Sequence, residues 1–119
     1  MFVQIMNIKK KLNGYKNQDE KWNIYSIHHF VSEEEVVQQL ESCKYTCYYC
    51  TRPVAMEYTA RDPLQWTLDR IDNTMGHNKG NVLISCLACN LKRRNRPVKK
   101  FLFTKQLVVH KCSGENVEV

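Results

Sequence analysis

The chain has 119 residues, of which 43% are hydrophobic and 25% charged, with only four glycines and three prolines. That length fits one domain, and the composition argues against disorder or low-complexity linkers as its main content. The formal net charge is +6, and no acidic residue occurs from Asn73 to Gly114. A one-signed segment favours a polyanionic partner, nucleic acid ahead of an acidic membrane or protein surface, although a basic face that only confers solubility is the alternative.

No apolar run approaches the roughly 18 residues that a transmembrane helix needs. The N-terminal residues 1–11 have a short apolar stretch followed by lysines, which is the reverse of a secretory signal. We therefore expect an intracellular protein, of the cytoplasm or nucleus, that is neither secreted nor bound to a membrane.

Residues 1–42 are expected to form an N-terminal extension that is partly helical and could contact a protein partner. Ser32 and Glu35 have the spacing of a capping box, in which each side chain satisfies a backbone amide of the other. This pattern predicts a helix from Glu33 to Ser42.

Four of the six cysteines form two C-x-x-C pairs, Cys47 with Cys50 and Cys86 with Cys89. Two such pairs can complete a tetrahedral thiolate site, and zinc is the metal that best suits four sulfur ligands. Disulfides would need an oxidising compartment, for which the sequence shows no signal segment. The spacing therefore predicts a structural zinc ion.

Cys43 and Cys112 remain unassigned. We interpret them as free thiols, because no fourth ligand stands out beside them. The alternative is a second metal site, in which His110 joins these two cysteines.

The stretch after residue 65 predicts two strands and a helix. Residues 66–71 largely alternate between apolar and polar side chains and contain β-formers, which predicts a first strand. Residues 72–80 are rich in turn residues and predict a loop, and residues 81–85 predict a second strand. Residues 86–94 then predict a short helix that begins with the second cysteine pair.

This order of elements resembles the ββα-metal unit (His-Me finger) of the HNH endonuclease family. The residues that carry the resemblance are Leu68-Asp69-Arg70-Ile71, then Gly80-Asn81-Val82, and then Cys86-Leu87-Ala88-Cys89-Asn90 with Lys92 following. The two C-x-x-C pairs resemble the zinc-containing branch that includes phage recombination endonuclease VII. The resemblance implies an α+β fold, with a small zinc-bound HNH-like domain over 43–100, the N-terminal extension before it and a C-terminal tail over 101–119.

The resemblance also implies a second, catalytic metal. In the family, a divalent cation held against the scissile phosphate polarises it and stabilises the leaving oxygen. Its ligands would be Asp69 and Asn90, whose oxygen atoms suit Mg²⁺ or Mn²⁺. Asn81 would fix the intervening loop through backbone hydrogen bonds. Taken singly, Asp69 is better explained by a surface salt bridge, and Asn81 and Asn90 by turn and cap roles. Taken together at the spacing of the family, the three residues favour a site.

One position departs from the family pattern. The family has a histidine general base directly after the acidic residue, and here that position holds Arg70. Arginine offers no lone pair at neutral pH and cannot take a proton from water. Another residue could be the base, with His77 the nearest candidate, or metal and substrate phosphate could activate the water while Arg70 stabilises charge. Catalysis could also be lost, and the sequence leaves all three readings open.

A basic segment covers the end of the predicted helix and the residues after it, and could clamp the phosphates of a nucleic acid without reading its bases. Its members are Lys92, Arg93, Arg94, Arg96, Lys99 and Lys100. The predicted function is a metal-dependent endonuclease that hydrolyses phosphodiester bonds in DNA. The alternative is a catalytically degenerate zinc protein that binds nucleic acid or serves as a structural or assembly subunit. Richness in Lys and Asn is compatible with an AT-rich genome such as that of a virus or phage.

Overall fold

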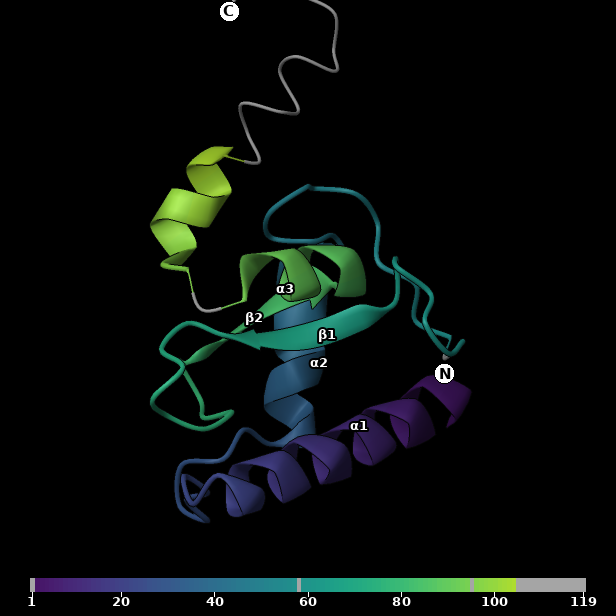
Figure 1. Cartoon of the computed structure of the whole chain (residues 1–119). Helices are drawn as coiled ribbons and strands as arrows, with labels where there is room; N and C mark the ends of the chain where they lie inside the picture. The colour runs from purple at the N-terminus through teal and green to yellow at the C-terminus, as the bar shows by residue number, and fades with distance from the viewer. Residues whose placement is uncertain (1, 58, 95, 105–119) are drawn as a thin grey trace, which may run out of the picture.

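The computed structural model describes residues 2–57, 59–94 and 96–104, and for residues 2–6 the backbone alone. Along the chain it contains α1 (Phe2–Lys21), α2 (Glu33–Ser42), β1 (Trp66–Arg70), β2 (Val82–Cys86) and α3 (Leu87–Arg93). Residues 98–104 form a further helical segment, drawn in yellow-green in Figure 1. His110 and Cys112, and most of the expected C-terminal tail, lie outside the described residues.

The helix predicted from the capping box is confirmed as α2. Ser32 Oγ accepts a hydrogen bond from the amide of Glu35 at 3.1 Å, and Glu35 Oε1 accepts from the amide of Ser32 at 2.9 Å. The predicted order of strand, loop, strand and helix is confirmed too, as β1, residues 71–81, β2 and α3.

Helix α1 has a buried stripe that explains why it packs on the rest of the molecule. Ile8, Leu12, Tyr15 and Asp19 recur at helical spacing, so they share one side of the helix. Ile8 and Leu12 belong to the hydrophobic core, and Asp19 is buried as well. The N-terminal extension therefore packs against the strands and contributes to their core.

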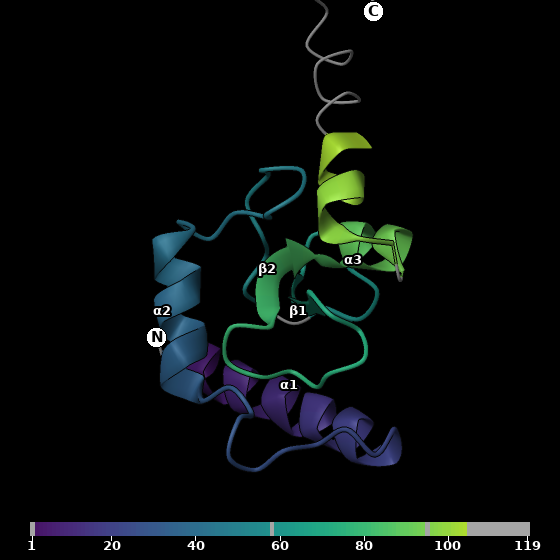
Figure 2. The ribbon, with the colours of Figure 1, turned by 90° about the vertical axis from the view of Figure 1, so that its left-hand side faces the viewer.

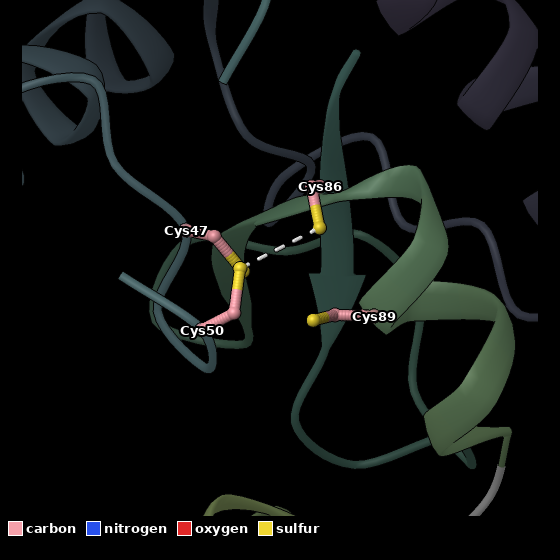
Figure 3. A group of neighbouring side chains, drawn as sticks. All are labelled: Cys47, Cys50, Cys86 and Cys89. Atoms are coloured by element: carbon pink, nitrogen blue, oxygen red, sulfur yellow. Dashed lines mark hydrogen bonds between the residues drawn. The ribbon is translucent and has the colours of Figure 1, made fainter. Parts of the chain in front are cut away.

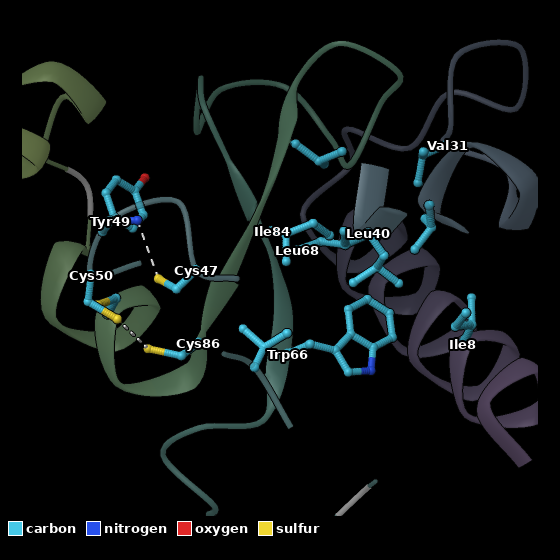
Figure 4. Packing of buried hydrophobic residues seen from close by; sticks show 14 of the residues in the cluster. Ile8, Val31, Leu40, Cys47, Tyr49, Cys50, Trp66, Leu68, Ile84 and Cys86 are labelled. Atoms are coloured by element: carbon cyan, nitrogen blue, oxygen red, sulfur yellow. Dashed lines mark hydrogen bonds between the residues drawn. The ribbon is translucent and has the colours of Figure 1, made fainter. Parts of the chain in front are cut away.

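The two strands form an antiparallel hairpin, with Trp66 opposite Cys86 and Arg70 opposite Val82. Successive side chains of a strand point to opposite faces. Trp66 and Leu68 pack in the hydrophobic core beside Leu40 of α2, whereas Thr67 contacts α3 on the other face (Figure 4). The hairpin thus lies between α3 and the layer formed by α1 and α2.

The long loop between the strands runs along α1, as Figure 2 shows from the side. This arrangement brings α1, β1, the loop and α3 around a shared cleft, described below. None of the helices in the described part of the chain combines the length and apolar character needed to cross a lipid bilayer.

Candidate functional site

The four cysteines of the two C-x-x-C pairs converge on one point (Figure 3). Their sulfur atoms all lie within 4.8 Å of one another, and all four residues are buried. Cys47 and Cys50 lie in a short turn, whereas Cys86 ends β2 and Cys89 lies in the first turn of α3. Four convergent thiols of this kind could hold a metal ion such as zinc.

Cys43 does not join this cluster. It is half-buried at the end of α2, and its thiol donates a hydrogen bond to the carbonyl of Leu40 at 3.5 Å. The other two ligands of the alternative second metal site, His110 and Cys112, lie outside the described residues.

Asp69 is buried on the face of β1 that packs against α3. One carboxylate oxygen accepts from the hydroxyl of Tyr49 at 2.7 Å, and the other accepts from Arg93 at 2.8 Å. Burial raises the pKa of the Asp69 carboxyl, while the Tyr49 hydrogen bond and the charge of Arg93 act in the opposite direction. The ion pair compensates the cost of burying this carboxylate.

Arg93 departs from the role expected of the basic segment. Its side chain is only 2% exposed and donates to Asp69 and to the carbonyls of Arg70, Ile71 and Arg96. Its guanidinium is therefore not available to a phosphate. The other members of the basic segment are exposed, namely Lys92, Arg94, Arg96, Lys99 and Lys100.

The sequence does contain a signal for the burial of Arg93. Residues four apart share one side of a helix, and Arg93 follows the buried Cys89 by four positions. Because Cys89 is a predicted metal ligand, its position identifies the buried side of α3. Arg93 lies on that same side.

Asn90 lies half-buried on α3, directly after the last cysteine. Its amide nitrogen donates to the hydroxyl of Thr67 at 3.0 Å. Asp69 and Asn90 both line the same cleft. Each oxygen of Asp69 accepts one hydrogen bond from a side chain, which leaves lone pairs for a cation. Magnesium sites commonly take one or two protein ligands and complete their coordination with substrate phosphate and water. The carboxylate of Asp69 and the amide oxygen of Asn90 are ligands of the type that such a cation takes.

The cleft has a volume of about 1100 Å³. Its lining comes from α1, β1, the loop between the strands and α3, and it includes Lys11, Tyr15, Asp69, Arg70, His77, Asn90 and Arg94. Three of these side chains are cationic and one is a carboxylate. The excess of positive charge suits a phosphate-bearing ligand.

Arg70 is fixed by the loop that follows it. Its guanidinium donates to the carbonyls of Asn73 at 3.0 Å and Met75 at 3.1 Å. The side chain is partly exposed and lines the cleft. Arg70 therefore shapes the loop and leaves a positive charge at the cleft.

His77 lies in the same loop and is held by α1. Its ring nitrogen Nδ1 is 2.8 Å from one carboxylate oxygen of Asp19, and its backbone amide donates to the other at 2.7 Å. The ring also stacks on Tyr15, with 4.3 Å between ring centroids. Burial lowers the pKa of His77, whereas Asp19 acts to raise it.

The sequence alone does not identify Asp19 as a partner of His77, although it contains a signal that Asp19 is buried. It continues the stripe of Ile8, Leu12 and Tyr15 on α1, so an acidic residue stands where the helix faces the core. A buried carboxylate needs a partner, but the sequence does not say which of the distant residues supplies it.

The loop itself is tied together by Asn81. The side chain of Asn81 accepts from the amide of Asp72 at 2.9 Å and donates to the carbonyls of Asp72 at 3.1 Å and Gly76 at 2.9 Å. These bonds are of the kind expected for a residue that fixes the loop rather than one that takes part in chemistry.

Gly76 allows Asp19 to approach the loop. A Cβ atom at this position would lie 2.5 Å from Asp19 Oδ2 and 3.0 Å from the carbonyl oxygen of Ile24. We expect Gly76→Ala to lower the free energy of unfolding by about 1–3 kcal/mol, as overpacking does. Gly14→Ala on α1 is the control: a Cβ there meets nothing within 4 Å, and a helical Gly→Ala change stabilises by about 0.5–1 kcal/mol. Urea unfolding of both variants measures the difference, and equal stability of Gly76→Ala and the unmodified chain would contradict the close packing.

Comparison with known proteins points to the same fold. No protein-family model and no curated protein sequence matches the chain. A solved structure of the rare-cutting HNH restriction endonuclease PacI, described as perturbing DNA, superposes with a TM-score of 0.64 at 14% sequence identity. The match covers 93% of this chain and 82% of that one. The protein therefore has an HNH-type fold, as the resemblance implied, with a four-cysteine cluster suited to a metal ion.

Proposed function

We propose that this protein is an HNH-type endonuclease that hydrolyses phosphodiester bonds in DNA with the help of Mg²⁺ or Mn²⁺. The observation that carries the proposal is the cleft, in which Asp69, His77 and Asn90 lie beside cationic side chains on an HNH-type fold. Such a combination offers oxygen ligands, a titratable imidazole and phosphate-binding groups together.

Asp69 and Asn90 would hold the divalent cation from β1 and α3. Bound there, the cation would polarise the scissile phosphate and stabilise the leaving oxygen. The Arg93 guanidinium and the Tyr49 hydroxyl fix the Asp69 carboxylate in one orientation. Zinc in the four-cysteine cluster would hold α3 against the hairpin, which sets the position of Asn90 relative to Asp69.

DNA phosphates would bind to the cations of the cleft, Lys11, Arg70 and Arg94, and to the exposed remainder of the basic segment. Burial lowers the pKa of Lys11 to about 8, so this side chain loses part of its charge in mildly alkaline solution. Because such contacts release counterions, DNA binding should weaken steeply with salt.

The presence of arginine at position 70 supports one alternative function. The position that carries the general base in the family holds a guanidinium bound to loop carbonyls, as expected of a degenerate site. The protein would then bind nucleic acid, or serve as an assembly subunit, without turnover. Cleavage of DNA by the unmodified chain distinguishes the two functions.

The variant Asn90→Leu tests the proposed cation site. Leucine has nearly the same volume and loses only the hydrogen bond to Thr67, so the fold should persist. We expect plasmid nicking in Mg²⁺ to fall by about 10²-fold or more, since a ligand that stabilises transition-state charge is lost. Asn90→Asp, which keeps an oxygen ligand, is the matched variant and should retain nicking. Equal nicking by Asn90→Leu and the unmodified chain would remove Asn90 from the site.

A further inference from the structure

We propose that His77, oriented by Asp19 of α1, takes the proton from the attacking water in place of the residue at position 70. The inference rests on the proposed nuclease function and deepens it, because it assigns the missing general base. It also gives a catalytic purpose to α1, which lies outside the ββα unit that the sequence resembles.

Asp19 holds the imidazole of His77 in one orientation. Asp19 is only 1% exposed, and both of its carboxylate oxygens bind His77, one through the backbone amide and the other through Nδ1. A carboxylate can only accept hydrogen bonds, so it selects the tautomer with a proton on Nδ1. Nε2 then carries the lone pair that a general base needs.

The other ring nitrogen of His77, Nε2, has no partner among the described residues. Within the described residues, the side-chain polar atoms sealed from solvent without a partner are Trp66 Nε1 and Asn78 Oδ1. Nε2 of His77 is not among them, and it makes no hydrogen bond to any described residue. Since His77 lines the cleft, this nitrogen is available to a water molecule there.

The groups around His77 favour its neutral form. The charged and titratable groups that face His77 are Asp19 and Tyr15 from α1 and Arg70 from β1. Burial is the largest influence and lowers the pKa of His77, Arg70 lowers it further, and Asp19 partly offsets both. The lowered pKa favours the neutral imidazole, which is the form able to accept a proton.

Tyr15 connects His77 to the proposed cation site. Its ring stacks on His77, and its hydroxyl accepts a hydrogen bond from the amide of Leu68 at 3.1 Å. Burial raises the pKa of Tyr15 to about 12, and the negative charge of Asp69 also acts to raise it. Leu68 immediately precedes Asp69 in β1. Tyr15, His77 and Asp69 all line the same cleft.

Hydrolysis of the phosphodiester needs no reactant other than water. As the water oxygen forms its bond to phosphorus, His77 Nε2 takes the water proton, and the bond from phosphorus to the leaving sugar oxygen breaks. The leaving oxygen keeps the electron pair and takes a proton from solvent, while the imidazolium later returns its proton to solvent. The products are a phosphate monoester and a sugar hydroxyl. Arg70 would stabilise the added negative charge on the phosphate.

The variant His77→Asn separates the chemical from the structural role. The asparagine amide can donate to Asp19 as Nδ1 does, but no basic nitrogen reaches the cleft. We expect the cleavage rate at neutral pH to fall by about 10²–10⁴-fold, the usual contribution of a general base. His28→Asn is the matched control, because His28 is exposed and lies in the connection between α1 and α2; it should cleave at the unmodified rate.

Asp19 is a positioning residue, and its test is the pH profile. In the unmodified protein the rate should fall as pH drops through the pKa of His77, because the imidazolium cannot accept a proton. Asp19→Asn removes the charge that stabilises the imidazolium, so the pKa of His77 falls and the acid limb moves to lower pH. If Asp19 had a purely structural role, Asp19→Asn would lower the cleavage rate but leave the pH of the acid limb unchanged.

A measurement on the unmodified, zinc-loaded chain covers the case in which Asp19→Asn fails to fold. Nitrogen-15 NMR of the His77 ring should show a protonated Nδ1 and a bare Nε2 at pH 7. The opposite tautomer, or full cleavage by folded His77→Asn, would overturn the assignment of the base. Failure of the unmodified chain to cleave any DNA would instead overturn the proposed function together with the step that rests on it.

Discussion

Replacing Cys89 with serine is expected to unfold the hairpin and α3 together. Cys89 is fully buried, and its sulfur lies within 4.8 Å of the other three. Binding of a structural zinc ion contributes about 10–16 kcal/mol in small zinc domains, which is comparable to the whole stability of a typical domain, about 5–15 kcal/mol. Because Trp66 and Leu68 of β1 belong to the core that α1 and α2 share, loss of the hairpin should destabilise the helices as well.

Circular dichroism and metal analysis measure this effect. The unmodified chain should contain one zinc ion and lose its cooperative thermal transition when the metal is removed. Cys43→Ser is the matched control, since Cys43 lies outside the cluster; its zinc content and melting temperature should stay close to those of the unmodified chain. Clearly less than one zinc per chain in fresh, reduced protein would contradict the assignment of the metal.

The second large effect is expected at Arg93. Arg93→Met keeps much of the side-chain volume but leaves the Asp69 carboxylate buried without its cation, which typically costs about 3–5 kcal/mol. The double variant Arg93→Met with Asp69→Asn should recover part of that loss, because the unpaired charge is gone. Urea unfolding of the two single variants and the double variant gives the coupling free energy.

Arg94→Met is the control for this series. Arg94 is the next residue and is exposed, so its replacement should change stability by less than about 0.5 kcal/mol. It should instead weaken DNA binding and reduce the salt slope by about one, as loss of a phosphate contact does. If Arg93→Met were as stable as Arg94→Met and equally impaired in DNA binding, Arg93 would have the phosphate-binding role expected from the sequence.

The predictable parts of the molecule are those governed by neighbours in the chain. The capping box of Ser32 and Glu35 determines where α2 begins, through two hydrogen bonds across three residues. The two C-x-x-C pairs predict the four-cysteine cluster, because the ligands of a metal must converge whatever the fold between them. The hairpin and α3 are predicted in the same way, by the alternation of apolar and polar residues and by the positions of turn residues.

The parts that could not be predicted depend on contacts between distant residues. Asp19 meets His77 across 58 positions, and nothing near either residue indicates the other. The buried position of Asp19 on its helical stripe shows that it needs a partner, but the partner depends on how α1 crosses the loop. Arg93 likewise looks like one more cation of a basic segment until α3 is placed against β1.

Conversion of supercoiled plasmid to nicked circles by the unmodified, zinc-loaded chain tests the nuclease function. The proposed function predicts nicking that requires added Mg²⁺ or Mn²⁺ and is lost in Asn90→Leu. DNA that is bound but left intact, on supercoiled, branched and single-stranded substrates with either cation, would contradict the nuclease function and support the degenerate, binding-only alternative.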